Sequence, residues 1–372
     1  MKDTGRSRPP APAARRSCSP CRSRPATGLA AVLALLALVA AKAAAQTDKP
    51  PSALPPARSY PYSVAESAMK EAPDPAATQK VAKPVGGTPA VAGQFKWQVA
   101  IIYSASKLDD PFSGYFCGGT LVGWRWVLTA AHCTYKDNPL GKKLPPVAIS
   151  GKEISVYVGS RNFVHGERIS IEEIVRHKGY NDETTDNDLA LLKLQREPAK
   201  KAELELLPLL EARDDVLPGE AATVVGWGST AKGVVPAEFR VPIRQLQFVD
   251  HIRVRQSDAC NRSHLESQRA ESARAWRAQG YGDAAIRTGL AEYFPYSRRL
   301  ITDNMFCAGT NDGSQDACFG DSGGPLVVYR RHRLVQAGVV SWGPNAGCAL
   351  TNLYGVYVRL SRYRDWITER VR

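Results

Sequence analysis

The 372-residue chain has no apolar run long enough to cross a membrane as a helix. Its longest, residues 29–40, holds a dozen residues, whereas a membrane span needs ~20. Acidic residues are also scarce at the start, where Asp3 stands against seven Lys and Arg within residues 1–27. A basic region, a short apolar run and small residues at 43–45 are typical of a secretory signal peptide. We therefore predict a signal peptide over residues 1–45 rather than a membrane anchor.

The chain also lacks a strong excess of one charge once that segment is set aside. Residues 1–45 hold eight of the 49 Lys and Arg and one of the 36 acids, so the remainder carries 41 basic and 35 acidic residues, a formal charge of +6. Nothing in this mild balance indicates a nucleic-acid partner. We expect an exported protein, secreted or periplasmic, with no stable membrane association after the signal is removed.

Beyond residue 45 there is no Cys-x-x-Cys pair and no cluster of histidines, which argues against a zinc site. Cys18 and Cys21 leave with the predicted signal peptide. An even number of cysteines in an exported chain predicts three disulfides, although six cysteines allow fifteen connectivities. The six that remain are Cys117, Cys133, Cys260, Cys307, Cys318 and Cys348.

Beyond the predicted signal peptide, the amino-acid composition defines two further regions. Residues 46–83 are rich in proline, with seven between positions 50 and 75, and are predicted to form a flexible propeptide or linker. From Phe95 onward, short runs rich in Val, Ile and Leu alternate with Gly, Pro, Asn and Asp, a pattern typical of strands in a barrel or sandwich. The runs predicted to be strands include 97–103, 119–127, 154–158, 189–194, 222–225, 326–328 and 334–342.

Helical patterns are confined to two places. Residues 265–279 and 283–293 are rich in Ala, Arg, Glu and Leu, which favours helices inside an otherwise strand-rich chain. At the C-terminus, residues 361–367 have helical spacing, and Ser361 is a candidate N-cap.

Three short motifs carry the chemistry. Thr129-Ala130-Ala131-His132-Cys133 supplies a general base, Asn187-Asp188-Leu189-Ala190 a carboxylate, and Gly320-Asp321-Ser322-Gly323-Gly324-Pro325 a nucleophile. A serine hydroxyl is a poor nucleophile at neutral pH, so it needs an adjacent base such as imidazole. In such a set the carboxylate fixes the imidazole tautomer and stabilises its protonated form. The order His132, Asp188, Ser322 is one of three known chain orders for this catalytic set.

With these motifs in this order, the chain resembles the chymotrypsin/trypsin family of serine proteases. The resemblance implies an all-β fold, with two packed six-stranded antiparallel β-barrels and a C-terminal helix, over a protease domain at residues 84–372. It implies the disulfides Cys117–Cys133, Cys260–Cys307 and Cys318–Cys348. Residues 261–300 are longer than the family's usual loop and form an inserted helical segment, which is either a solvated decoration or an exosite beside the cleft.

The same resemblance implies the parts of the active site. The backbone N–H groups of Gly320 and Ser322 would form the oxyanion hole. Asp316 would lie at the floor of the specificity pocket and pair with the Arg or Lys before the scissile bond of a protein or peptide substrate. The remaining substrate-binding positions are Ser341, Trp342, Gly343 and Gly355. The loop at 159–169 is too short and acid-poor for the family's calcium site, so no metal or other cofactor is expected.

One departure concerns activation. Zymogens of this family are usually cut before Ile-Val-Gly-Gly, and the new amine pairs with the acid before the nucleophile, here Asp321. This chain reads Lys83-Pro84-Val85-Gly86-Gly87, so Pro84 occupies the new N-terminus. Either Asp321 pairs with a Pro84 amine or the chain works uncut with another partner for Asp321.

The resemblance therefore implies a secreted serine endopeptidase that cleaves after Arg or Lys through an acyl-enzyme. An active enzyme without a preference for basic residues is one alternative. The alternative from another class is a non-catalytic binding protein on the same fold, but such relatives generally lose a member of the catalytic set.

Overall fold

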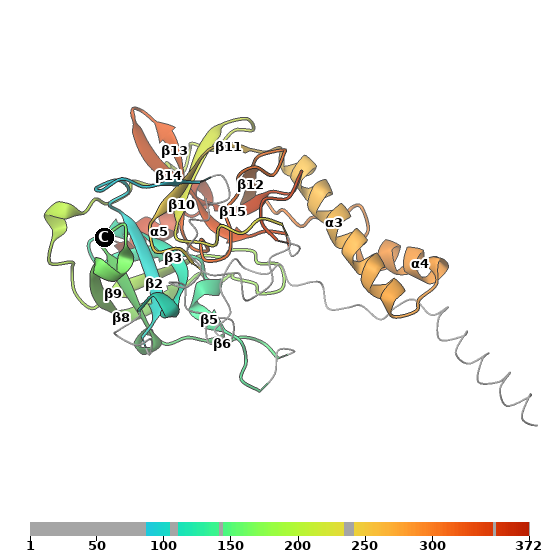
Figure 1. Cartoon of the computed structure of the whole chain (residues 1–372), viewed down its shortest axis with the longest axis horizontal. Coiled ribbons are helices and arrows are strands. Elements are labelled where there is room, and N and C mark those ends of the chain that lie inside the picture. The colour runs from blue at the N-terminus through green and yellow to red at the C-terminus, as the bar shows by residue number, and fades with distance from the viewer. Residues whose placement is uncertain (1–86, 105–110, 141–143, 234–241, 345–346, 372) are drawn as a thin grey trace, which may run out of the picture. The chain divides into compact units, whose positions relative to one another are not determined.

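The structure is a computed structural model, and it describes residues 87–104, 111–140, 144–233, 242–344 and 347–371. The predicted signal peptide, the proline-rich segment and Pro84 lie outside the described residues. Strands are the most frequent regular elements of the described chain, as the short apolar runs predict (Figure 1).

Six antiparallel strands close the first barrel. Each strand pairs with its neighbour in the order β2-β3-β4-β9-β8-β7, and β7 pairs back onto β2. Residues 99–102 of β2 are fully buried in the core, as the unbroken apolar sequence Val-Ala-Ile-Ile predicts. The strands are β2 (Gln98–Tyr103), β3 (Tyr115–Gly123), β4 (Trp126–Thr129), β7 (Ile154–Val158), β8 (Glu167–Arg176) and β9 (Ala190–Leu194).

The second barrel also has six strands, in the order β11-β10-β13-β14-β15-β12, and it is closed by pairing of β11 with β12. A two-residue strand near the start of the described chain, β1, adds to β11. The strands are β1 (Thr88–Pro89), β10 (Ala221–Gly226), β11 (Gln247–Val254), β12 (Met305–Gly309), β13 (Pro325–Arg330), β14 (Arg333–Trp342) and β15 (Gly355–Arg359). The expected architecture of two six-stranded barrels is thus confirmed.

Short elements fill the connections. A two-stranded ribbon pairs β5 with β6 directly after the His132 segment. The elements are β5 (Tyr135–Lys136), β6 (Val147–Ala148) and the 3₁₀ turns η1 (Pro111–Gly114), η2 (His132–Thr134), η3 (Gly151–Glu153), η4 (Phe163–His165), η5 (Lys201–Glu203) and η7 (Leu360–Arg362).

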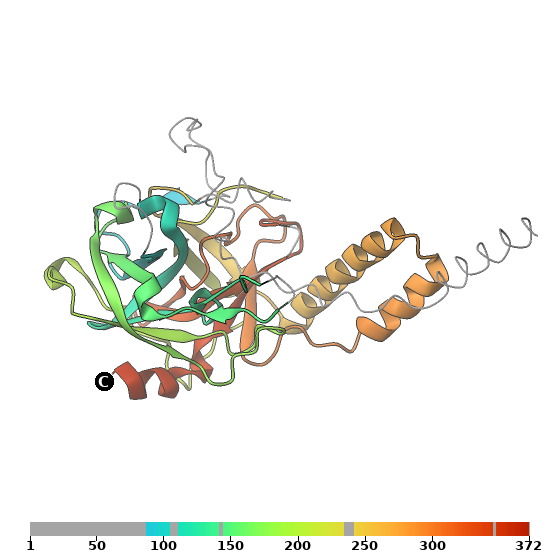
Figure 2. The ribbon, with the colours of Figure 1, turned by 90° about the horizontal axis from the view of Figure 1, so that it is seen from below.

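The predicted inserted helices are present as α3 (Ser257–Ala278) and α4 (Asp283–Tyr293). They pack against each other around the buried Trp276 and project beside the second barrel (Figures 1 and 2). The second helix has the predicted bounds, whereas α3 begins eight residues before the predicted start at 265. The first turn is polar, so the apolar pattern does not reveal it.

The C-terminal helix is α5 (Arg364–Val371). Ser361 is not its N-cap, contrary to the prediction, because it lies inside the preceding turn η7 and its hydroxyl donates to Asp215. Within the described residues, no helix has the length and apolarity that crossing a membrane requires.

The three disulfides have the pairing that the resemblance implies. The bonds are Cys117–Cys133, Cys260–Cys307 and Cys318–Cys348. The second anchors α3 to β12, so the inserted helices are covalently tied to the second barrel.

Candidate active site

His132 and Asp188 form the first part of the site, and both belong to the first barrel. His132 opens the turn η2 after β4, and Asp188 lies two residues before β9, the strand paired with β4. The Asp188 Oδ2 atom is 2.7 Å from His132 Nδ1, and Oδ1 accepts the His132 backbone N–H at 2.8 Å. Since a carboxylate only accepts, the proton is on Nδ1 and Nε2 is free to act as a base.

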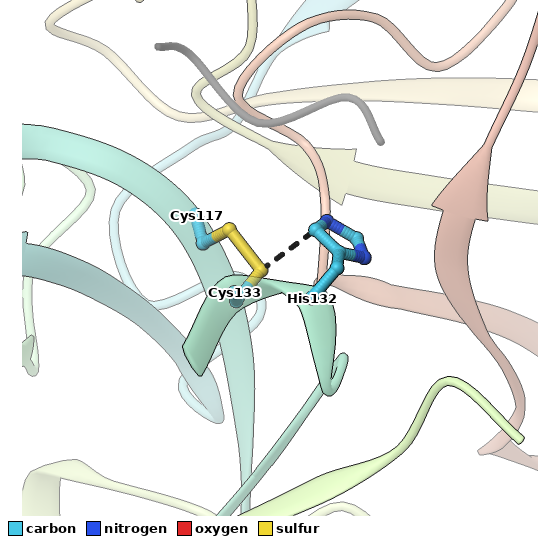
Figure 3. A group of neighbouring side chains, drawn as sticks. All are labelled: Cys117, His132 and Cys133. Atoms are coloured by element: carbon cyan, nitrogen blue, oxygen red, sulfur yellow. Dashed lines mark hydrogen bonds between the residues drawn. A yellow bond between two sulfur atoms is a disulfide. The ribbon is translucent and has the colours of Figure 1, made fainter. Parts of the chain in front are cut away.

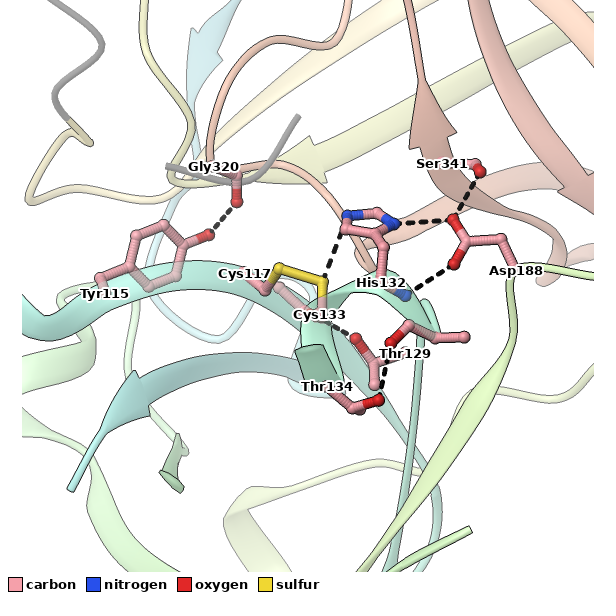
Figure 4. Close-up of a disulfide and its surroundings, with 11 residues drawn as sticks. Tyr115, Cys117, Thr129, His132, Cys133, Thr134, Asp188, Gly320 and Ser341 are labelled. Carbon is pink, nitrogen blue, oxygen red and sulfur yellow. Dashed lines mark hydrogen bonds and ion pairs between the residues drawn. A yellow bond between two sulfur atoms is a disulfide. The ribbon is translucent and has the colours of Figure 1, made fainter. Parts of the chain in front are cut away.

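Asp188 is fully buried and receives a further hydrogen bond from the second barrel. The Ser341 hydroxyl at the end of β14 donates to Asp188 Oδ2 at 2.6 Å (Figure 4). The sequence indicated Ser341 only as a substrate-binding position, so this side-chain contact is a finding of the structure. It joins the two barrels at the carboxylate.

Ser322 lies in the turn before β13 and is held beside this junction by its backbone. Its carbonyl accepts the Gly118 N–H at 2.7 Å, next to the Cys117–Cys133 disulfide. The following Gly323 donates to Val340 O at 2.8 Å, one residue before Ser341. Gly323 has φ +77°, and a Cβ there would come within 2.1 Å of Thr129 Oγ1, so this position requires glycine.

The Ser322 hydroxyl is buried and has no hydrogen-bond partner among the described residues. His132 Nε2 instead lies 3.6 Å from Cys133 Sγ (Figure 3). The structure therefore joins Asp188 to His132 but does not show the Ser322–His132 hydrogen bond. In the absence of substrate such catalytic hydrogen bonds are often long or poorly aligned, and they tighten in the Michaelis complex.

Gly320 lies at the candidate oxyanion hole with φ +99°. Its carbonyl accepts a 2.6 Å hydrogen bond from the Tyr115 hydroxyl, which belongs to β3 of the first barrel (Figure 4). Burial raises the pKa of Tyr115 well above its usual value, with Asp321 adding to the effect, so the phenol remains a donor. This hydrogen bond holds the peptide unit between Gly320 and Asp321 in place. Tyr115 could not be identified from the sequence, since no motif marks a residue that contacts its partner 205 positions away.

Asp316 is almost completely buried and has one unsatisfied oxygen. Oδ2 accepts the Ala349 N–H at 3.0 Å, whereas Oδ1 has no partner among the described residues. Burial raises its pKa to about 7, and the nearby Asp321 carboxylate adds to the rise. A Cβ at Gly355 would come within 3.1 Å of Oδ1, so glycine there leaves the carboxylate open on that side.

Asp321 is half-buried, and its carboxylate is also shielded from water. Its oxygens accept the N–H groups of Gly228 at 2.8 Å and Cys318 at 2.9 Å. Burial nevertheless raises the pKa of Asp321 to about 6, because these two bonds compensate only part of the lost hydration. The described residues offer no ion pair to this group. Pro84, its expected partner, lies outside them.

Trp342 is the last residue of β14, and Gly343 follows it. The pairing of β13 with β14 ends at Pro325 and Val339, so in the described chain the edge beyond Val340 is open on the β13 side. A shallow hollow follows there, lined by Trp342, Gly343 and Pro344 and by residues of α3.

Two groups of His and Cys side chains lie close enough to resemble metal ligands. They are Cys117, His132 and Cys133, drawn in Figure 3, and Cys260, His264 and Cys307. In both groups the two sulfurs form a disulfide, so they are not available as thiolate ligands.

Comparisons with known proteins agree with this arrangement. A family model described as trypsin matches residues 84–367. A curated relative, tryptase of Mus musculus, is 31% identical over 302 residues, which cover 81% of this chain and 92% of the relative.

Proposed function

The chain belongs to the trypsin family of serine proteases, and we propose that it is an exported endopeptidase that cleaves after Arg or Lys through an acyl-enzyme. The observation that carries the specificity is the buried Asp316 carboxylate with its unsatisfied Oδ1. The three disulfides support export, since such bonds persist in oxidising compartments.

In the proposed reaction, Ser322 Oγ attacks the carbonyl carbon of the scissile peptide while His132 Nε2 takes its proton. The tetrahedral intermediate collapses, the C–N bond breaks, and the imidazolium gives its proton to the leaving amine. Water then attacks the ester carbonyl with the same base, which frees the carboxylic acid and restores the Ser322 hydroxyl. Asp188 keeps the proton on Nδ1 and stabilises the imidazolium.

The intermediate carries an oxyanion that needs fixed donors. The backbone N–H groups of Gly320 and Ser322 are the proposed donors, and Tyr115 holds the intervening backbone from the first barrel. Removing one such donor in a serine protease costs roughly 3–4 kcal/mol of barrier.

A basic side chain in the Asp316 pocket would supply the missing partner of Oδ1. A buried carboxylate without a cation is unfavourable, so much of the discrimination comes from pairing that charge. The glycines at 343 and 355 leave space for a long side chain.

For activation, we propose that Asp321 pairs with the amine of Pro84 after cleavage at Lys83-Pro84. Thr88 pairs with Phe248, and Phe248 and Asp321 line one pocket, so residue 88 lies close to the pocket that contains this carboxylate. A proline ammonium has two N–H groups, one fewer than other N-terminal residues, and the Lys-Pro bond requires an activator other than a trypsin-like enzyme.

A defined mixture of peptides tests the function. The wild type is expected to cut after Arg and Lys only, and Ser322→Ala to cut nothing. Ser322→Ala is a fair control, because the hydroxyl makes no hydrogen bond among the described residues. Asp316→Ser should lower kcat/KM for basic substrates by roughly 10²- to 10³-fold, since it removes one partner of a buried charge pair. Cleavage by Ser322→Ala at the same rate would contradict the proposal.

Intact mass of the active form tests the activation step. A mature chain that begins at Pro84 supports pairing with Asp321. An active chain that begins well upstream contradicts it and favours an enzyme that works uncut.

A non-catalytic binding protein on this fold is the other candidate. It is not favoured, because Asp188 is hydrogen-bonded to His132 in the way that a general base requires, and Ser322 is present. Absence of any cleavage by a chain correctly trimmed at Pro84 would favour it.

A further inference from the structure

A hollow lies between the inserted helix α3 and the open end of β14. One face of α3 supplies His264, Ser267, Gln268 and Glu271, which follow one another at helical spacing. The opposite side is formed by Trp342, Gly343 and Pro344. Because Ser341, the residue before Trp342, contacts Asp188, the hollow begins one residue from the catalytic set.

Glu271 is the charged residue of this lining. The imidazole of His264 packs edge-on against Trp342 at 5.0 Å between ring centres, and its Nε2 donates to Tyr354 O at 2.9 Å. Burial lowers the pKa of His264 to about 4, so this ring is neutral at pH 7. The hollow therefore carries a single negative charge.

Glu271 has no cation of its own among the described residues. Its carboxylate accepts one hydrogen bond, from the Ser267 hydroxyl at 3.1 Å. Two arginines of the helical hairpin are bound elsewhere: Arg269 donates to the carbonyls of Leu290 and Phe294, and Arg277 pairs with Asp283. A half-buried carboxylate with one neutral donor can accept further hydrogen bonds from a cation.

An extended peptide added to the open edge beyond Val340 would run past this carboxylate. Main-chain pairing at such an edge fixes the register, and side chains on one face of the added strand enter neighbouring pockets. In the proposed function the side chain before the scissile bond enters the Asp316 pocket, so residues two or three positions earlier would lie beside Trp342 and Gly343.

We infer that Glu271 of α3 forms a second acidic subsite, which binds an Arg or Lys side chain two or three residues N-terminal to the one held by Asp316. The inserted helices would then select substrates that have two basic residues separated by two or three positions. This inference rests on the proposed endopeptidase function, since it uses the same cleft.

Four fluorogenic peptides test it. All four carry Arg directly before the scissile bond. The first two peptides differ two positions before that Arg, where one has Arg and the other Gln. The other two peptides have the same difference three positions before it. The enzymes are wild type, Glu271→Gln and the matched control Glu266→Gln, which alters an exposed acid of α3 outside the hollow. Active enzyme is first counted with an arginine-like phosphonate that labels Ser322, so a poorly folded variant does not distort the rates.

The wild type and Glu266→Gln should prefer Arg over Gln by about fivefold in kcat/KM at one of the two positions, and Glu271→Gln should show no preference. The preference should shrink at 1 M salt, because salt screens a partly exposed pair. No preference in the wild type, or an unchanged one in Glu271→Gln, would overturn the inference. If the phosphonate labels no enzyme that is trimmed at Pro84, the proposed function fails instead, independently of Glu271.

Discussion

Two carboxylates of the second barrel, Asp316 and Asp321, are shielded from water and have no cation paired with them among the described residues. Asp316 and Asp321 both have raised pKa values, mainly because burial disfavours the charged form. Residues tuned in this way gather at functional sites, where substrate or a processed terminus completes them. In the proposed function, Asp316 forms an ion pair with a basic side chain of the substrate, and Asp321 forms one with the amine of Pro84.

The raised pKa of Asp316 predicts a pH-dependent affinity for cations. A pKa of about 7 means that the free carboxyl group is protonated below that pH and ionised above it. A benzamidinium ion needs the ionised form, so its affinity should fall about tenfold per pH unit below 7 and level off above 8. Competition binding from pH 5 to 9 measures this. A flat profile would contradict the assignment, and Asp316→Ser should bind weakly with little pH dependence.

Tyr115 is predicted to position the oxyanion hole from the other barrel. Tyr115→Phe removes its hydrogen bond to Gly320 O and should lower kcat by about tenfold with little change in KM, because the lost alignment matters only in the transition state. The free energy of unfolding should fall by only about 1 kcal/mol. The exposed Tyr329, changed to Phe, is the matched control. An unchanged kcat with reduced stability would show a purely structural role.

At the scale of elements, the loop before β9 is fastened to both barrels. Asp186, two residues before Asp188, accepts hydrogen bonds from Thr302 at 2.9 Å and from Asn304 at 3.1 Å, which lie between α4 and β12. Asn187 accepts from the Tyr363 hydroxyl at 2.9 Å. This loop therefore couples the base of the helical insertion to Asp188, the proposed catalytic carboxylate.

Asp186→Ala tests this coupling. It should lower the free energy of unfolding by about 1–3 kcal/mol, because Thr302 and Asn304 lose a charged acceptor. It should also lower kcat several-fold, since Asp188 loses its support across the barrels. Glu183→Ala, at an exposed acid of the same loop, should change neither quantity in urea unfolding and steady-state assays. Equal effects of the two variants would contradict the coupling.

Several strands could be predicted from the sequence because their apolar runs are local. The run 154–158 is β7 with the same bounds, whereas the run 119–127 is divided by a turn at Trp124 and Arg125 into β3 and β4. The polar strand β8 is half-buried, so a search for apolar runs does not find it. The motifs locate His132, Asp188 and Ser322 for the same local reason.

At the scale of the whole molecule, the site is assembled from residues that only the fold brings together. Ser341 meets Asp188 across 153 positions, and Tyr115 meets Gly320 across 205. No local pattern encodes such pairs, because they depend on how the two closed barrels pack. The hollow beside Glu271 is likewise invisible in the sequence, although the helices that form it are predictable.

The most direct measurement is intact-mass spectrometry of the secreted protein after exposure to an arginine-mimicking phosphonate, with Ser322→Ala in parallel. We expect one covalent adduct per chain on the wild type, located at Ser322, and none on the variant. The same spectrum gives the mature N-terminus. A chain that begins at Pro84 and takes up no phosphonate would contradict the claim that this site is a serine protease for basic residues.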